Sequence, residues 1–452
     1  MRLAEVTQLI STDTRRALIG IGVTGLSVAR FLRSQGRDFD VYDSRENPPN
    51  LDTFQAEFPD LRLHLGALDD TDLCGYSEVI LSPGIDPKIS WVQSALQAGV
   101  KVFGDIELFA QAVDKPVIAI TGSNAKSTVT TLVAEMARAD GKKVGVGGNL
   151  GTAALDLLDE NVDMYVLELS SFQLELVDSL APAAACILNF SADHMDRYAS
   201  MLEYHAAKQR IYKKAERLVF NREDQLTQPL LQDGQTSLNF GLSNPDINDF
   251  GLSHIDGETW LVRGHHPLIA AADVALKGAH NHANVLAAMA LAQMVGISEA
   301  AMKTVAQHFT GLPHRCQLVS QYNSVQWIDD SKATNVGAVV AALEGLGSNK
   351  NIVLIAGGQA KGQQFDELKS LVKQHVKQLV LIGQDADKLA AVLQESAPTL
   401  FAVSMDAAVQ AAAQSSQAGD IVLLSPACAS FDMFKGYEHR GQEFARVVEA
   451  LV

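Results

Sequence analysis

The sequence predicts an α/β protein of three domains, each built around a mainly parallel sheet. With 452 residues the chain is longer than a single hydrophobic core usually organises. Short apolar strands alternate with helical patterns along most of its length, which is typical of parallel sheets covered by helices. Two of the strand-to-helix turns are rich in glycine. We expect domains at residues 1–104, 105–311 and 312–452.

Composition and charge exclude several classes of function. The formal net charge is −17, so no excess of basic residues is available for a polyanionic partner such as nucleic acid. No apolar run approaches the roughly 18 residues of a membrane span, and the N-terminus lacks the pattern of a signal peptide. Cys74, Cys186, Cys316 and Cys428 have neither metal-site nor disulfide spacing. We therefore expect a cytoplasmic protein whose cysteines are buried, unpaired thiols.

The first block contains strands at 17–22, 39–42 and 78–81 and a helix at 26–33. Its motif Gly20-Ile-Gly22-Val-Thr-Gly25 lies between the first strand and the helix, and Asp43 follows at the end of the second strand. This is the spacing of a Rossmann-like dinucleotide site, where glycines let the backbone approach a pyrophosphate. An NAD-dependent dehydrogenase fits the motif, and so does a protein that binds a UDP-sugar. A tight turn that binds nothing is the third interpretation.

The second block carries a stronger phosphate signal. After a strand at 116–120 the chain reads Thr121-Gly-Ser-Asn-Ala-Lys-Ser-Thr128 and enters a helix. Backbone N–H groups at the helix start, the Lys126 ammonium and the hydroxyls of Ser127 or Thr128 suit phosphates and Mg²⁺. The loop is shorter than the usual P-loop, and Ala125 stands where glycine is usual. If the backbone there is left-handed, the alanine costs on the order of 1 kcal/mol.

Candidate metal ligands follow the next strands of this block, at 164–167 and 185–188. Glu168 ends one strand, and Asp193, His194 and Asp196 follow the other. Because ligands gather at the carboxyl ends of parallel strands, we expect Mg²⁺ near this edge. Residues 250–275 read as appended hairpins and are followed by helices at about 281–294 and 299–308.

The third block begins after a linker at 310–313. Its strands are expected at 352–356, 378–382 and 421–424, with helical patterns between them. The predicted fold is thus a Rossmann-like N-terminal domain, a central P-loop ATPase-type sheet with hairpins, and a Rossmann-like C-terminal domain.

Taken together, these segments resemble the Mur ligases of bacterial peptidoglycan synthesis. The resemblance runs from end to end, and its strongest stretches are residues 121–131, 144–151, 167–175, 193–198, 204–212, 280–288, 311–315, 329–337 and 424–434. Within the family the sequence is most similar to the ligases that add D-glutamate to UDP-N-acetylmuramoyl-L-alanine. The resemblance implies that ATP phosphorylates the substrate carboxylate and that the amine of D-glutamate attacks the acyl phosphate. It also implies two Mg²⁺ ions, small-molecule partners and a role in cell wall biogenesis, and we expect a monomer.

The resemblance further implies site residues. The catalytic residues would be Lys126, Asn149, His194 and Lys208, the last carried as a carbamate that helps to hold Mg²⁺ with Ser127, Thr128, Glu168 and His194. ATP would be bound by Gly122, Ser123, Asn124, Ala125, Lys126, Ser127, Thr128, Asn281, Asn284, Arg315 and Asp330. The UDP-substrate would be bound by Val23, Thr24, Asp43, Ser44, Arg45 and Gly84, and D-glutamate by Lys332, Thr334, Lys361, Ser430, Phe431 and Tyr437.

The sequence departs from the family pattern at three positions. Ala125 replaces the loop glycine, Gln359 stands where relatives are often acidic, and Tyr437 stands where phenylalanine is frequent. The alternatives are a sister Mur enzyme, a folylpolyglutamate-type ligase, and a catalytically idle relative that binds nucleotide. Without the resemblance, Lys208 would be interpreted as a solvated helix lysine.

Overall fold

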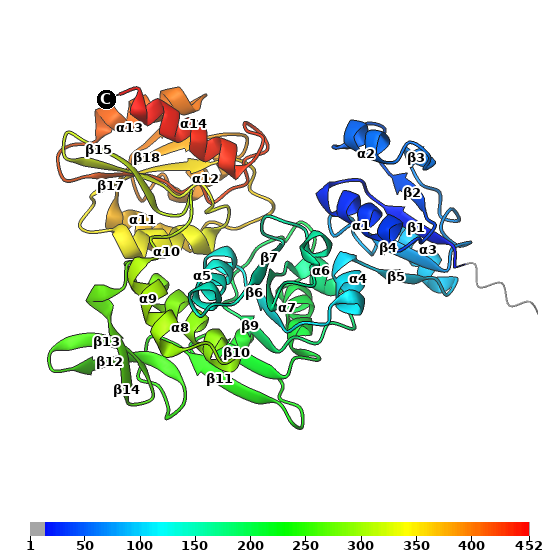
Figure 1. Ribbon diagram of the computed structural model, residues 1–452. Coiled ribbons are helices and arrows are strands. Elements are labelled where there is room, and N and C mark those ends of the chain that lie inside the picture. Colours follow the sequence, from blue (N-terminus) through cyan, green and yellow to red (C-terminus); the bar gives the residue numbers. More distant parts are fainter. Residues whose placement is uncertain (1–13, 452) are drawn as a thin grey trace, which may run out of the picture. The chain divides into compact units, whose positions relative to one another are not determined.

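The computed structural model describes residues 14–451 (Figure 1). These residues form two compact units. The first unit comprises residues up to 116 together with 145–181, and the second comprises 117–144 and 182 onward. Within residues 14–451, no helix is long and apolar enough to cross a membrane.

The first unit contains a parallel five-stranded sheet of order β3-β2-β1-β4-β5. Its elements are β1 (Arg16–Ile19), α1 (Val23–Ser34), β2 (Asp40–Asp43), α2 (Leu51–Glu57), β3 (Leu63–Leu65), β4 (Glu78–Leu81), α3 (Ser90–Gln97), β5 (Lys101–Phe103) and α4 (Asp105–Ala112). The three strands expected from the sequence are β1, β2 and β4. The strands β3 and β5 have three residues each, too short to give a periodic signal.

The same unit also contains β7 (Val144–Gly148), the 3₁₀ turn η1 (Ala154–Leu157), β8 (Met164–Glu168) and α6 (Ser171–Glu175). All five residues of β8 are buried, which explains its continuous apolar sequence. A capping box starts α6: the Ser170 hydroxyl accepts from the Gln173 N–H, and the Gln173 side chain accepts from the Ser170 N–H.

The second unit holds strands in the order β14-β13-β12-β11-β10-β9-β6. Pairing is parallel from β6 to β12 and antiparallel from β12 to β14, so the hairpins expected at 250–275 are confirmed. The elements are β6 (Val117–Thr121), α5 (Lys126–Ala139), β9 (Ala184–Ile187), α7 (Met201–Gln209), η2 (Arg210–Tyr212), β10 (Arg217–Asn221), η3 (Gln225–Thr227), β11 (Thr236–Phe240), β12 (Phe250–Ile255), β13 (Glu258–Arg263), β14 (His266–Ala270), η4 (Ala271–Asp273), α8 (Ala279–Met294) and α9 (Glu299–His308).

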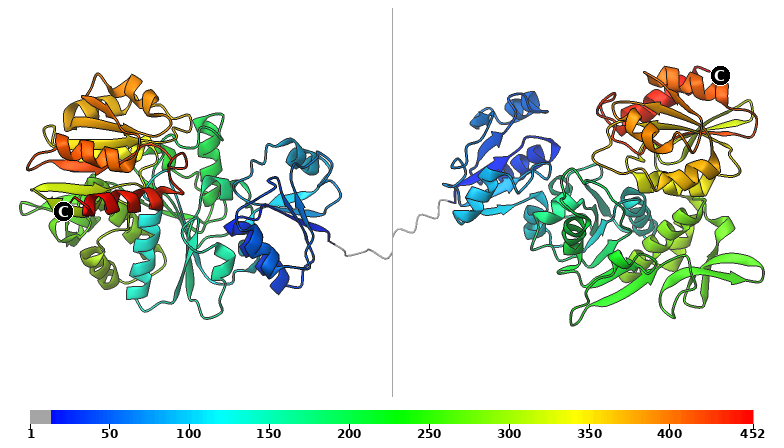
Figure 2. Two further views of the ribbon diagram at one scale, coloured as in Figure 1. Left: turned by 90° about the horizontal axis from the view of Figure 1, so that it is seen from above. Right: turned by 180° about the vertical axis from the view of Figure 1, so that it is seen from behind.

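A six-stranded sheet of order β15-β16-β20-β17-β18-β19 completes the second unit. Helices cover both of its faces (Figure 2): one core joins the sheet to α10, α11 and α12, and the other joins it to α13 and α14. The elements are β15 (Gln317–Tyr322), β16 (Val325–Asp329), α10 (Val336–Leu346), β17 (Ile352–Gly357), α11 (Leu368–His375), β18 (Val376–Ile382), α12 (Ala386–Leu393), β19 (Thr399–Phe401), α13 (Met405–Ser415), β20 (Ile421–Leu424) and α14 (Tyr437–Glu449). Only β15 pairs antiparallel, as an edge hairpin with β16.

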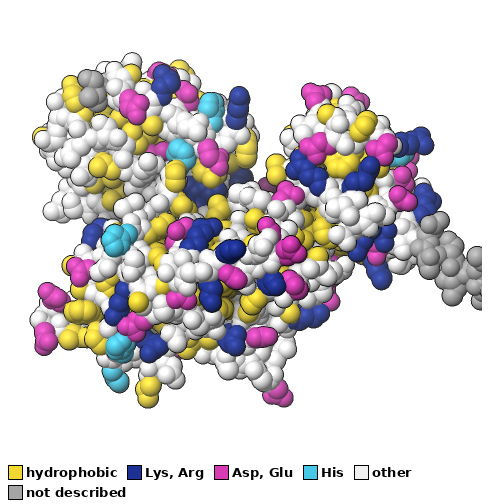
Figure 3. Space-filling view, in the orientation of Figure 1, with side chains coloured by type: hydrophobic (Ala, Val, Ile, Leu, Met, Phe, Trp, Pro, Cys, Tyr) yellow, Lys and Arg dark blue, Asp and Glu magenta, His cyan; other side chains and the backbone are white. Residues whose placement is uncertain are grey.

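All four cysteines are free, as predicted. Cys186 and Cys428 are buried, but Cys74 and Cys316 are only partly buried, so the expectation of buried thiols was wrong for these two. On the face drawn in Figure 3, Lys and Arg side chains are interspersed with Asp and Glu.

Candidate active site

The loop between β6 and α5 has the form of a phosphate-binding loop. Ala125 lies immediately before the helix with φ 63° and ψ 0°, the left-handed conformation in which a methyl group is strained. No side chain caps the first turn of α5, so its N–H groups and the positive end of the helix dipole are available to an anion. The Lys126 Nζ donates to the carbonyls of Gly122 and Ser123, both at 2.9 Å. Lys126 therefore lies over the loop rather than in solvent.

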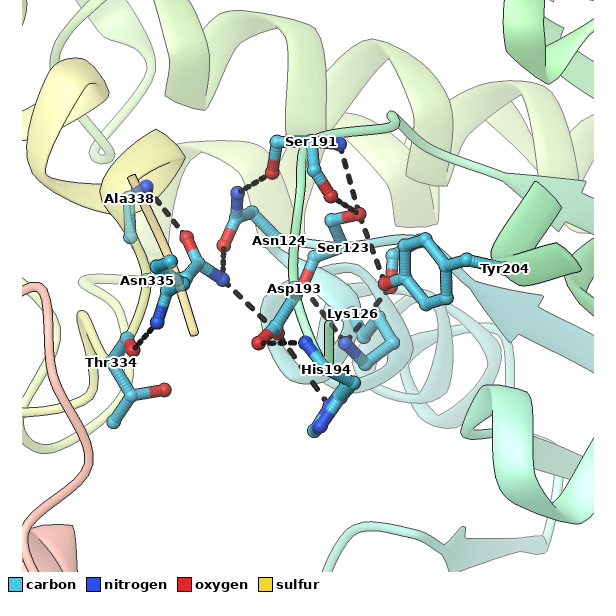
Figure 4. Close-up of polar contacts among 12 residues, drawn as sticks. Ser123, Asn124, Lys126, Ser191, Asp193, His194, Tyr204, Thr334, Asn335 and Ala338 are labelled. Atoms are coloured by element: carbon cyan, nitrogen blue, oxygen red, sulfur yellow. Dashed lines mark hydrogen bonds and ion pairs between the residues drawn. The ribbon is translucent and has the colours of Figure 1, made fainter. Parts of the chain in front are cut away.

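The segment that follows β9 holds this loop in shape (Figure 4). The Asn189 side chain accepts from the Asn124 N–H at 2.8 Å and donates to the Asn124 carbonyl at 3.2 Å. The Ser123 hydroxyl donates to the Ser191 carbonyl at 2.9 Å and lies 3.1 Å from the Tyr204 hydroxyl. The loop backbone is thus fixed by a second segment of the sheet edge, which preorganises its N–H groups.

Asp193 and His194 lie beside the loop. His194 adopts φ 58°, and its N–H donates to Asp193 Oδ1 at 2.9 Å, while its Nε2 lies 3.6 Å from Asp193 Oδ2. Burial lowers the pKa of His194, and the cations Lys361, Lys126 and Lys208 lower it further against the opposing charge of Asp193. A neutral imidazole in this position can offer a lone pair to a metal.

Lys208 is a buried lysine, 1 % exposed, on α7. Its Nζ donates to the Thr121 hydroxyl at 3.2 Å and to the Gly122 carbonyl at 2.9 Å, and it lies 4.8 Å from the centre of the Tyr204 ring. The interpretation of Lys208 as a solvated surface lysine is therefore wrong. Its amine lies against the phosphate loop.

Arg315 connects the C-terminal module, which is the six-stranded sheet β15–β20 with its helices, to α5. Its Nη2 donates to the Ser127 hydroxyl at 2.7 Å. Asp330 interacts electrostatically with Arg315 and is buried. Asp330 accepts from the Cys316 N–H at 3.2 Å and from the Ser425 hydroxyl at 2.8 Å. Burial raises the pKa of Asp330 to about 7, despite these hydrogen bonds and the charge of Arg315.

Asn281 and Asn284 lie in the first turns of α8. The Asn281 amide donates to the Lys277 carbonyl at 2.8 Å, and the Asn284 amide lies 3.3 Å from the Asn281 side-chain oxygen. The two predicted nucleotide residues thus contact each other, and both are half-buried.

The predicted amino-acid residues lie in the C-terminal module. The Lys332 ammonium lies 3.7 Å from the centre of the Tyr437 ring, a cation–π contact. The backbones of Gln359 and Ala429 exchange two hydrogen bonds of 2.9 Å, which joins the segment of Lys361 to that of Ser430 and Phe431. Lys361 has φ 48°, Ser430 is buried and Phe431 is 68 % exposed. Thr334 belongs to the segment that starts α10, two residues after Lys332.

A buried arginine connects two loops of this module. Arg440, 1 % exposed, donates to the Ser331 hydroxyl, the Ser331 carbonyl and the Cys428 carbonyl at 2.9, 2.8 and 3.0 Å. Burial lowers its pKa to about 10. The loops that follow β16 and β20 are therefore fixed by one guanidinium.

In the first unit, the glycine motif forms a tight turn between β1 and α1. A Cβ on Gly25 would overlap the Gly20 carbonyl oxygen, and a Cβ on Gly20 would lie 2.9 Å from the Ser82 Cβ, next to the turn that contains Gly84. No side chain caps α1, whose first residue Val23 is 68 % exposed and is followed by Thr24. The geometry suits the close approach of a diphosphate.

Asp43 is buried at the end of β2. It accepts from the Ile21 N–H at 3.0 Å, and Arg45 donates to it from its backbone N–H, its Nε and its Nη2 at 3.0, 2.8 and 2.7 Å. Burial alone would raise the pKa of Asp43, but these donors outweigh it and lower the pKa. Asp43 thus fixes the glycine turn and orients Arg45, while Ser44 between them is exposed.

Asn149 and Glu168 pair in the first unit. The Asn149 amide donates to Glu168 Oε1 at 2.7 Å, and its N–H donates to the Glu168 carbonyl at 2.8 Å. Glu168 is buried.

The structure brings most predicted residues of the second unit into contact with one another or with the phosphate loop. Among residues 14–451, however, no group of three or more His, Cys, Asp or Glu side chains is arranged to hold a metal ion. Asn335, Gln363 and Arg440, which shape the site, were missed. A signal for Asn335 is present, since an asparagine before an apolar run is a helix N-cap pattern.

Three family models match the chain in succession. The MurD-like N-terminal domain of Mur ligases matches residues 14–104, the Mur ligase middle domain matches 120–292, and the Mur ligase glutamate ligase domain matches 314–428. UDP-N-acetylmuramoylalanine--D-glutamate ligase of Pseudomonas fluorescens is 49% identical over 445 residues, which cover 98% of this chain and 99% of the relative. The chain belongs to the Mur ligase family.

A further relative and two solved structures are also similar to this chain. The same ligase of Pseudomonas aeruginosa is 48% identical over 98% of this chain and 99% of its own. UDP-N-acetylmuramate-alanine ligase MurC from Thermotoga maritima shares the fold with a TM-score of 0.61 at 19% identity, over 97% of this chain and 100% of its own. MurF from Acinetobacter baumannii gives 0.60 at 16% identity, over 96% and 93% of the two chains. The α/β fold class with three sheets is therefore confirmed.

Proposed function

We propose that this protein is an ATP-dependent ligase that joins D-glutamate to UDP-N-acetylmuramoyl-L-alanine in peptidoglycan precursor synthesis. The observation that carries the proposal is the preorganised phosphate loop, with Lys126 over it and Arg315 hydrogen-bonded to Ser127. The two Pseudomonas relatives are named for this reaction, which supports the choice of substrates.

For ATP we assign the loop residues, Asn281, Asn284, Arg315 and Asp330. The N–H groups at the start of α5 and the Lys126 ammonium would offset the charge of the terminal phosphates. Arg315 would place a second cation at the same loop. Charge that develops on the transferring phosphoryl group would then be stabilised by groups already in place.

For Mg²⁺ we assign Ser127, Thr128 and His194 of the second unit and, from the family resemblance, Glu168 of the first. Hydroxyl, carboxylate and neutral imidazole donors fit a metal that keeps several water or phosphate ligands. When bound, Mg²⁺ would neutralise phosphate oxygens. A carbamate on Lys208 would place an anion beside the loop, and the buried amine near Thr121 suits that role. Mass spectrometry of the native protein in bicarbonate tests it.

The acceptor substrate we assign to the first unit, with its diphosphate at the turn before α1. Val23, Thr24, Asp43, Ser44, Arg45 and Gly84 would hold the UDP group, and Asn149 would lie near the reacting carboxylate. For D-glutamate we assign Lys332, Thr334, Lys361, Ser430, Phe431 and Tyr437. Two cations and three hydroxyls suit an amino acid with two carboxylates.

The reaction we propose has two steps. An oxygen of the substrate carboxylate attacks the terminal phosphorus of ATP, and ADP leaves with the electrons of the broken P–O bond. The amine of D-glutamate, in its unprotonated form, then attacks the acyl carbon and the C–O bond to phosphate breaks. The nitrogen loses a proton to the departing phosphate, and an amide and inorganic phosphate result. Lys126 would stabilise the phosphoryl group and His194 would hold the metal beside it. Lys332 and Lys361 would bind the carboxylates of D-glutamate and so orient its amine.

The domains we propose are 1–104 for the UDP-substrate, 105–311 for ATP and 312–452 for the amino acid. We further propose a cytoplasmic monomer, because its substrates are ATP, a UDP-linked precursor and a free amino acid.

Phosphate release from ATP and Mg²⁺ tests the function. With UDP-N-acetylmuramoyl-L-alanine present, release should require D-glutamate and should be absent with L-glutamate. Release with UDP-N-acetylmuramate and L-alanine, or with a folate and L-glutamate, would instead identify a sister ligase or a folylpolyglutamate-type enzyme. ATP binding without any release would indicate an idle relative.

A further inference from the structure

Asn335 links the C-terminal module to the phosphate loop. Its amide Nδ2 donates to Asn124 Oδ1 at 2.9 Å and lies 3.3 Å from Asp193 Oδ2 (Figure 4). Asn124 belongs to the loop, and Asp193 is the partner of His194. One side chain, 4 % exposed, therefore contacts both the loop and the residue that orients His194.

The other side of the Asn335 amide is fixed by its own helix. Asn335 is the N-cap of α10, and its Oδ1 accepts from the Ala338 N–H at 2.9 Å. Because the oxygen is held by the cap, the amide nitrogen must point toward Asn124 and Asp193. Gln363 fixes the backbone on both sides of Asn335. Its Oε1 accepts from the Val336 N–H at 3.0 Å, and its Nε2 donates to the Thr334 carbonyl at 3.3 Å.

The approach of α10 to the loop also leaves no room for a side chain. A Cβ on Gly337 would lie 2.8 Å from the Ser191 hydroxyl oxygen and 3.0 Å from the Asn124 amide nitrogen. Three features therefore favour the contact between α10 and the phosphate loop. The Asn335 oxygen is held by the helix cap, Gln363 holds the neighbouring backbone, and Gly337 has no side chain.

We propose that Asn335 is a positioning residue that holds the phosphate loop and the Asp193–His194 pair in the arrangement that binds ATP. This role rests on the proposed function and adds to it a coupling between the C-terminal module and the ATP site. Its chemistry is that of a neutral donor between an amide oxygen and a carboxylate. A residue that only caps α10 would not need the amide nitrogen.

The test separates capping from bridging. Asn335→Ser and Asn335→Asp both keep an N-cap oxygen but lose the bridging donor, and Asn335→Asp also places a second carboxylate near Asp193. We expect kcat/KM for ATP to fall about 5- to 30-fold in Asn335→Ser, because a hydrogen bond to an amide oxygen and a longer one to a carboxylate are lost, and further in Asn335→Asp. KM for D-glutamate should change less than about twofold.

A matched control removes a cap elsewhere in the same module. Ser404 caps α13 through the Ala407 N–H at 3.2 Å. Ser404→Ala should lower the melting temperature while leaving kcat/KM for ATP unchanged. Gly337→Ala, in contrast, should weaken ATP kinetics as Asn335→Ser does, because its methyl group would displace the Ser191 hydroxyl and the Asn124 amide.

The outcomes are distinct. Wild-type ATP kinetics in Asn335→Ser and Asn335→Asp would overturn the proposal and leave Asn335 a helix cap. Binding of a nonhydrolysable ATP analogue, measured by calorimetry on the full chain, should weaken in the same order as the kinetics. If the wild type bound the analogue but ligated nothing, the proposed function would fail. The calorimetric series would still decide the role of Asn335.

Discussion

Replacing Ala125 by glycine should stabilise the protein. Ala125 adopts φ 63° and ψ 0° at the start of α5, and a non-glycine residue in the left-handed region costs about 1–2 kcal/mol. Glycine removes that cost but loses about 0.4–1 kcal/mol through the greater freedom of the unfolded chain. The expected net gain in the free energy of unfolding is therefore about 0.5–1 kcal/mol. Glycine also keeps the loop conformation, so KM for ATP should change little.

The control is the same substitution in a right-handed helix. Ala411 lies inside α13, where Ala411→Gly should destabilise by about 1 kcal/mol. Thermal and urea unfolding of both variants should be compared with those of the wild type. The free energy of unfolding should rise in Ala125→Gly and fall in Ala411→Gly. If Ala125→Gly destabilised the protein as Ala411→Gly does, the left-handed conformation assigned to the loop would be refuted.

Three further predictions concern residues outside the loop. Gly25→Ala should destabilise the first unit by at least about 3 kcal/mol and abolish binding of the UDP-substrate, because its methyl group would overlap the Gly20 carbonyl. A Cβ on Gly22 would lie in open space at φ −70°, so Gly22→Ala should leave the free energy of unfolding nearly unchanged. A loss of stability equal to that of Gly25→Ala would contradict this. Burial raises the pKa of Asp105 to about 6, above its unfolded value of 3.8, so its contribution to stability is complete below about pH 4 and is lost as the pH rises through 6. The stability of Asp105→Asn relative to the wild type should therefore rise between about pH 4 and pH 6 and stay level at higher pH, and a difference that did not change between pH 4 and pH 6 would count against it. Arg440→Lys should lower the free energy of unfolding in urea by about 2–4 kcal/mol, because an ammonium cannot reproduce the three hydrogen bonds of the guanidinium. A change below about 0.5 kcal/mol would show that these hydrogen bonds are not needed for stability.

The sequence was sufficient for the features that depend on local pattern. Periodic apolar runs predicted the main strands, and glycine spacing predicted both tight turns between a strand and a helix. Lys208 shows the limit of this approach, since a lysine on a short helix looks solvated until β6 is placed beside it. Asn335 shows another limit: its cap is readable, but its contacts with Asn124 and Asp193 span 211 and 142 residues. The very short strands β3, β5 and β19 depend on their neighbours and carry no periodic signal.

Oxygen transfer from the acceptor to phosphate tests the central claim most directly. UDP-N-acetylmuramoyl-L-alanine labelled with ¹⁸O in its terminal carboxylate is turned over with ATP, Mg²⁺ and D-glutamate, and the released phosphate is analysed by mass spectrometry. An acyl phosphate requires that one ¹⁸O appear in each phosphate released. Phosphate that carried only oxygen from ATP and water would show that ATP is cleaved without activating the carboxylate, and the proposed reaction would be wrong.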